Sequence, residues 1–183
     1  MKFVKWLIVA VAVLLGLFVL VTFFLPQDYY VERTTRINAP APVVYSQVAD
    51  LEAWQKWNPW SDLDPEMEIT YGESKVGQGA SYSWISEAAG NGSMTITEAD
   101  APNHVRYKLA FEGYESQPSF SEMILKSDNP AGPTTVTWTF EGDVGDKFFA
   151  RWMAVLMDKF VGASYDKGLA ALKERCENPP VEG

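Results

Sequence analysis

The hydrophobic positions of the chain begin with one unbroken apolar segment. Residues 4–25 read VKWLIVAVAVLLGLFVLVTFFL, and Lys5 is the only charged residue among them. About 20 such residues form a helix that crosses a bilayer core of about 30 Å. Apolar side chains on every side of this helix leave no polar stripe for the surface of a soluble protein. The pattern therefore predicts a transmembrane anchor over residues 1–26.

A cleaved signal peptide is the alternative interpretation of this segment. Such a peptide has a shorter apolar core, followed by a cleavage site of small residues in a small-x-small pattern. Here the apolar segment is long and ends in TFFLPQD, which contains no such site. We therefore expect the segment to remain as a single-pass anchor.

The charges that flank the anchor predict its orientation. Lys2, Lys5 and the amino terminus lie at its start, whereas Asp28 and Glu32 follow it before the first basic residue, Arg33. Because basic residues favour the cytoplasmic side, the amino terminus is expected in the cytoplasm. In a bacterium, the anchor would then lie in the inner membrane and the rest of the chain in the periplasm.

Beyond the anchor, apolar and polar residues alternate in a way that predicts about seven β-strands. Glycine, asparagine and proline mark turns between them, including Asn91-Gly92, which is typical of a tight hairpin. The strands are expected near residues 31–38, 67–71, 82–84, 93–97, 105–112, 120–126 and 134–141. The sequence does not settle which face the side chains of residues 120–126 occupy. One apolar and one polar face are typical of an antiparallel sheet with one solvated side.

Two segments show helical periodicity instead. The first begins after Asn38, a residue suited to cap a helix, and continues to Asn58, where Pro59 ends it. The second covers residues 146–177. Its apolar side chains are expected near one stripe, which contains Phe149, Met153, Leu156, Phe160 and Leu172. Gly162 and Gly168 interrupt this helix, so they indicate either a bend or a close approach of another element.

The order of these elements predicts an α+β fold for residues 27–178, followed by a short tail over residues 179–183. One long helix must cover the apolar face of a bent sheet. A single helix cannot fill the hollow of a strongly curved sheet, so either aromatic side chains pack the space or a ligand cavity remains. Periodicity alone leaves both possibilities open.

Two motifs bear a family resemblance. The stretch INAPAPVVYSQVADLEAWQKWNPWS (residues 37–61) resembles the opening of the START-like superfamily, also called SRPBCC, and particularly its polyketide cyclase/dehydrase and lipid-transport branch. The ending YDKGLAALKERCE (residues 165–177) is similar to the tail of that branch. The resemblance covers residues 30–177 and implies a helix-grip fold with a deep apolar pocket. Its members include lipid carriers, hormone binders and cyclases, so the fold alone does not give the function.

The candidate pocket wall is mostly aromatic, which suits a nonpolar or aromatic ligand. Trp54, Trp57 and Trp60 either line the pocket or act as structural wedges that close the end of the sheet. The full set of candidates is Trp54, Trp57, Trp60, Tyr82, Trp84, Tyr107, Phe111, Trp138, Phe140, Met153 and Phe160.

Groups suited to catalysis or to metal binding are few. His104 is the single histidine, and neither a catalytic triad nor a histidine metal site can be assembled from it alone. We expect it in a surface turn. The acidic run that contains Asp62 and Asp64 lacks the spacing of a calcium loop. Glu98 falls on the apolar face of its strand, and Arg151 neighbours the inner face of the last helix. We assign no catalytic residue, metal or cofactor.

The net charge limits the kinds of molecule that the domain can bind. Without Lys2 and Lys5, the remainder of the chain carries 13 basic and 24 acidic side chains, a net charge of −11. Such a surface repels nucleic acid and anionic lipid headgroups. Cys176 is the only cysteine, which excludes an internal disulfide.

Three functional hypotheses follow. The first is a membrane-tethered domain that binds an apolar small molecule or lipid, with residues 4–25 in the membrane. The second is an accessory subunit whose anchor contacts another membrane protein. An enzyme of the cyclase or dehydratase kind ranks last, because polar catalytic groups are scarce.

Overall fold

A single seven-stranded antiparallel sheet organises the computed structural model, which describes residues 2–61 and 63–179. The strand order is β1-β7-β6-β5-β4-β3-β2. The strands are β1 (Asp28–Ile37), β2 (Glu68–Tyr71), β3 (Ser81–Ile85), β4 (Gly92–Asp100), β5 (His104–Phe111), β6 (Ser119–Lys126) and β7 (Thr134–Asp143). All seven predicted strands are therefore confirmed.

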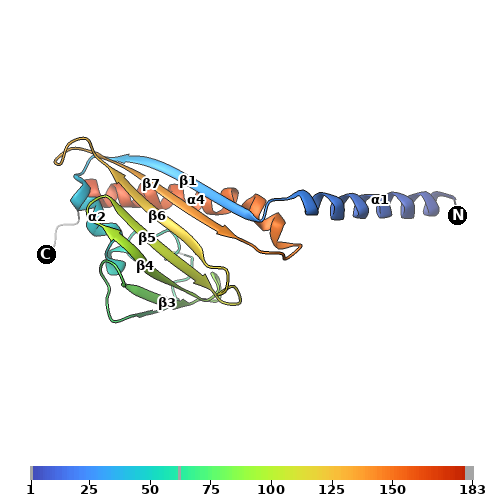
Figure 1. Cartoon of the computed structure of the whole chain (residues 1–183), viewed down its shortest axis with the longest axis horizontal. Coiled ribbons are helices and arrows are strands. Elements are labelled where there is room, and N and C mark those ends of the chain that lie inside the picture. Colours follow the sequence, from blue (N-terminus) through green and yellow to red (C-terminus); the bar gives the residue numbers. More distant parts are fainter. Residues whose placement is uncertain (1, 62, 180–183) are drawn as a thin grey trace.

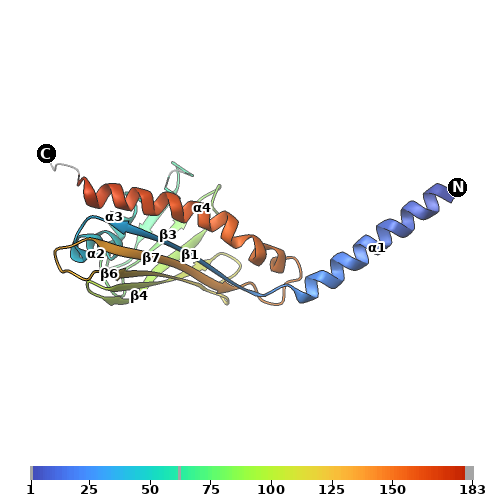
Figure 2. The same cartoon turned by 90° about the horizontal axis from the view of Figure 1, so that it is seen from above.

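The long helix α4 (Ala150–Glu177) lies lengthwise across one face of this curved sheet (Figures 1 and 2). Two short helices, α2 (Ala41–Val48) and α3 (Leu51–Trp54), follow β1 at the end far from the amino terminus. This arrangement confirms the α+β, helix-grip architecture. The predicted early helix is split in two, and Pro40 rather than Asn38 is its N-cap residue.

Asp50 marks the break between the two short helices. Its carboxylate accepts hydrogen bonds from the backbone N–H groups of Glu52, at 2.8 Å, and Ala53, at 3.3 Å, and so caps α3. Asp50→Ala is expected to lower the free energy of unfolding by about 1 kcal/mol, as the loss of an N-cap usually does. Urea unfolding measures this loss. Asp50→Asn keeps an acceptor and should stay close to the wild type, and equal stabilities of all three proteins would contradict the capping role.

The buried side of α4 differs from the predicted stripe. Of the five apolar residues expected there, Leu172 is buried, whereas Phe149, Met153, Leu156 and Phe160 are exposed. Most of the buried residues of α4 are small, and one is a tyrosine. The buried residues of α4 are Ala154, Gly162, Tyr165, Gly168, Leu169, Leu172 and Cys176.

Gly168 shows why small residues are needed there. A Cβ atom at this position would lie 2.7 Å from the ring of Trp138, so the glycine marks a close approach of helix and sheet. Three residues earlier along the same face of α4, Tyr165 stacks on Trp138 with ring centroids 3.7 Å apart and ring planes 13° apart. The Ser121 hydroxyl then accepts a hydrogen bond from Trp138 Nε1 at 2.9 Å. This buried cluster fixes α4 on β6 and β7.

Two local predictions were wrong. The β3–β4 hairpin does not turn at Asn91-Gly92, because β4 already begins at Gly92 and the glycine with positive φ is Gly90. Glu98 is exposed, not on the apolar face, because the strand register shifts between Ile96 and Glu98. This β-bulge adds one residue and moves the following side chain to the other face.

The amino-terminal helix α1 (Lys2–Phe24) projects from the domain (Figures 1 and 2). It is long and apolar enough to cross a membrane. Between Phe3 and Phe24, Thr22 is the only buried residue. Three residues, 25–27, connect this helix to β1.

Candidate ligand-binding cavity

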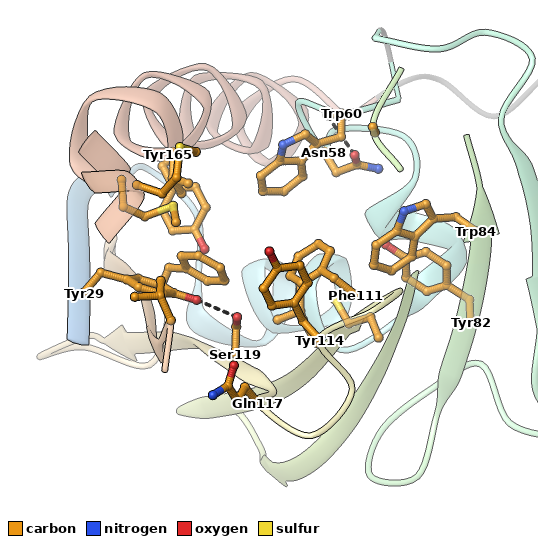
Figure 3. A pocket seen from close by; sticks show the side chains of 18 of the residues that line it. Tyr29, Asn58, Trp60, Tyr82, Trp84, Phe111, Tyr114, Gln117, Ser119 and Tyr165 are labelled. Carbon is orange, nitrogen blue, oxygen red and sulfur yellow. Dashed lines mark hydrogen bonds between the residues drawn. The ribbon is translucent and has the colours of Figure 1, made fainter. Parts of the chain in front are cut away.

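A cavity of about 460 Å³ lies between α4 and the sheet. Ligand sites usually enclose about 300–1,000 Å³, so the space is large enough for a small organic molecule. Figure 3 shows aromatic side chains from α4, the sheet and the segment after α3 arranged around the hollow. The aromatic residues that the sequence offers therefore do not fill the space between helix and sheet.

Seven of the eleven candidate residues line this cavity. They come from α3, the segment that follows it, three strands of the sheet and α4. The seven are Trp54, Trp60, Tyr82, Trp84, Phe111, Phe140 and Met153. Their role in binding remains a prediction, but the structure does bring them around one space.

Three further candidates lie in the core outside the cavity wall. Trp57 donates its Nε1 hydrogen bond to a backbone carbonyl of α2 at 3.0 Å, and the hydroxyl of Tyr107 donates to another at 2.7 Å. Trp138 is fully buried beneath α4. Trp57 and Tyr107 thus hold α2 against the sheet, and Trp138 holds α4. Phe160 also lies outside the lining residues, because it faces away from the sheet and is exposed.

The turn at residues 58–61 explains how Trp60 reaches the cavity. The side-chain oxygen of Asn58 accepts hydrogen bonds from the backbone N–H groups of Trp60, at 3.0 Å, and Ser61, at 3.1 Å. This turn folds Trp60 back over Tyr165, with ring centroids 6.0 Å apart. Trp54 and Trp60 line the cavity, while Trp57 is a wedge, so each interpretation describes part of the cluster.

Sequence reasoning missed several lining residues, including the polar pair Tyr29 and Ser119. Their hydroxyl groups form a hydrogen bond of 2.6 Å, drawn as a dashed line in Figure 3. Tyr29 shares the inner face of β1 with Val31, so strand alternation was sufficient to find it. Methionine and aliphatic residues complete the wall. Among the missed residues are Met67, Met94, Leu109, Met157 and Val161.

Burial raises the pKa of three phenol groups that line the cavity. Burial raises the pKa of Tyr82 to about 12, although its neighbours Trp54 and Gln55 act in the opposite direction. Burial also raises the pKa of Tyr29 and of Tyr165. Because raised phenol pKa values favour the protonated form, these side chains bring no negative charge to the cavity.

The cavity opens at the end of the domain that carries α1. Among its lining residues, Tyr114, Asp143 and Met153 are exposed, and they belong to the β5–β6 loop, the end of β7 and the start of α4. Figure 1 shows these parts on the side of α1. In the described part of the chain, Asp143 is the only charged residue that lines the cavity. The wall therefore suits an uncharged apolar molecule and offers little for proton transfer.

Solved structures from Thermobifida fusca and Thalictrum flavum have the same fold. A structure from Thermobifida fusca aligns with a TM-score of 0.61 at 21% identity, covering 80% of this chain and 91% of that one. Norcoclaurine synthase from Thalictrum flavum, in complex with dopamine and hydroxybenzaldehyde, aligns with a TM-score of 0.59 at 11% identity, covering 85% and 90%. At these identities the likeness establishes the fold alone.

A family model gives a more specific assignment. No curated protein matches the sequence significantly. The model described as "Polyketide cyclase / dehydrase and lipid transport" matches residues 30–177, which is most of the chain and the same stretch that the sequence resemblance covers. The chain therefore belongs to the polyketide cyclase/dehydrase and lipid transport family of the SRPBCC superfamily.

Proposed function

We propose that this domain binds an apolar small molecule or a lipid in the cavity beneath α4, while α1 holds it at a membrane. The observation that carries the proposal is the cavity itself, because it combines a ligand-sized volume with an aromatic and aliphatic wall. Burying apolar ligand surface contributes about 25 cal/mol per Å². An apolar molecule therefore gains most of its binding free energy from such a wall.

The tether is the second part of the proposal. Helix α1 exposes apolar side chains around its whole circumference, and a bilayer would cover them. The basic residues at its start favour a cytoplasmic amino terminus, so we infer that in a bacterium the domain lies in the periplasm at the inner membrane. Tethering keeps the cavity at a high effective concentration next to the lipid.

Binding is favoured over catalysis by the same wall. Norcoclaurine synthase, which has the same fold, binds dopamine and hydroxybenzaldehyde in its solved structure. In the present cavity burial keeps Tyr29, Tyr82 and Tyr165 protonated, and Asp143, the one charged lining residue among those that the structure describes, is exposed at the opening. General acid–base catalysis needs a titratable group within hydrogen-bond reach of the reacting atoms. The inner part of this cavity offers apolar contact instead.

Native mass spectrometry of residues 27–183 tests the proposal. The buried core consists of residues from Val31 onward, so this fragment contains the whole core. After expression in bacteria, the protein is expected to carry a noncovalent adduct that denaturation releases and that extraction identifies as apolar. Protein that remains free of adduct after incubation with a total lipid extract would contradict the proposed binding function.

A further inference from the structure

The first three turns of α4 carry an apolar surface that the domain does not cover. Four large side chains, spaced at i, i+4, i+7 and i+11, lie on one side of the helix, and each is at least 40% exposed. They are Phe149 at 73%, Met153 at 51%, Leu156 at 40% and Phe160 at 57%. Exposed apolar patches of this kind mark contacts with proteins or membranes.

The same part of the chain contacts α1. Trp152 stacks on Phe18 with ring centroids 5.0 Å apart and ring planes 6° apart, and Phe148 packs edge-on against Phe18 and Phe23. The Nε1 group of Trp152 also donates a hydrogen bond of 2.9 Å to the hydroxyl of Thr22. The start of α4 is thus attached along the last turns of α1.

The position of this contact along α1 sets its depth. The apolar span Phe3–Phe24 is about 33 Å long as a helix and so just matches a bilayer core of about 30 Å. Phe18 lies six residues before the end of the helix, which corresponds to about 9 Å. If α1 crosses the bilayer, the residue that stacks on Phe18 must lie below the membrane surface.

We propose that residues 148–160 lie in the interface of the outer leaflet, with their apolar side chains among the lipid tails. This inference rests on the proposed membrane tether, and it names the lipid as the partner of this helix surface. Arg151 fits the same position, because its guanidinium donates hydrogen bonds of 3.2 Å to the carbonyl oxygens of Phe23 and Leu25, at the carboxyl end of α1. Amphipathic helices at interfaces bury their apolar side to about 5–10 Å.

Apolar insertion, not charge, drives this contact. Within α4, the segment carries Arg151, Asp158 and Lys159, so its charges nearly cancel, while the rest of the domain is strongly acidic. Contact is therefore expected with phosphatidylcholine, a lipid without net charge, and should persist at high salt.

The contact also places the cavity against the lipid. Ala150, Met153 and Met157 belong to the proposed membrane segment and line the cavity as well. Met153 is both exposed and part of the wall. An apolar ligand can therefore pass between the leaflet and the cavity along this side of α4 without crossing bulk water.

Site-directed spin labelling of the full chain in phosphatidylcholine vesicles tests the inference. In a Cys176→Ser background, single cysteines replace Phe149, Phe160, Leu14 or Ala171, and each is labelled with a nitroxide. Leu14 reports on α1, and Ala171 is an exposed position in the distant half of α4. Oxygen partitions into lipid and a neutral nickel chelate into water, so their collision rates with the label give its depth.

Labels at Phe149→Cys and Phe160→Cys are expected to collide more with oxygen than with nickel, at a depth of about 5–10 Å, whereas Ala171→Cys should show the reverse. If the label at Leu14→Cys collides mainly with oxygen while the labels at Phe149→Cys and Phe160→Cys collide mainly with the nickel chelate, the inference is overturned and the tether stands. If Leu14→Cys reports water as well, the tether and the inference both fail.

Discussion

Val161→Trp is expected to weaken retention of an apolar ligand by at least about tenfold, or ~1.4 kcal/mol. Val161 lines the cavity from α4, and an indole group at that position occupies space that a ligand would need. The cavity offers room for the larger side chain, so the domain should remain folded. Native mass spectrometry gives the occupied fraction, and a thermal melt checks the fold.

Ala163→Trp is the matched control for this variant. Ala163 lies two residues further along α4, is exposed and does not line the cavity, so ligand retention should remain at the wild-type level. Leu109→Trp tests the opposite element, because Leu109 lines the cavity from β5. If both cavity variants retained as much ligand as the control, the molecule would bind elsewhere.

Trp138→Ala is expected to lower the free energy of unfolding by about 3–5 kcal/mol, as large-to-small substitutions of buried aromatic residues do. Trp138 is fully buried, stacks on Tyr165 and donates a hydrogen bond to Ser121. Its removal leaves a void beneath α4 and breaks the contact that fixes the helix on the sheet. Urea unfolding followed by circular dichroism measures the loss.

Trp138→Phe separates the two contributions. It keeps an aromatic ring against Tyr165 but removes the N–H donor, so a smaller loss of about 1–2 kcal/mol is expected. A Trp138→Ala protein as stable as the wild type would show that this cluster does not hold α4 in place.

Strand alternation predicted the sheet well wherever the inner face is apolar. It could not place β6, because the inward residues at its start are the serines Ser119 and Ser121, while Phe120 faces outward over Arg106. Each inward serine has an aromatic partner, Tyr29 or Trp138. Such pairing depends on strands that are distant in the sequence, so no local pattern reveals it.

The orientation of α4 was missed for a related reason. Hydrophobic periodicity assigns the large apolar residues to the buried side, yet the sheet approaches α4 so closely that a Cβ atom at Gly168 would collide with the ring of Trp138. At Gly162, the guanidinium of Arg33 occupies the place of a side chain. The larger side chains then lie on the other side. Because Phe160 was assigned to the buried side of α4, it was also predicted to line the pocket.

If the domain carries the apolar ligand proposed for it, the length of the connector between α1 and β1 limits how far it can carry that ligand. Residues 25–27 can extend by only about 10 Å, and Arg151 ties the start of α4 to the same place. With α1 in a bilayer, the domain has no freedom to shuttle between two membranes. A bound ligand would be taken up from, or released to, one membrane only, and its transfer to another membrane would require a second, freely diffusing carrier.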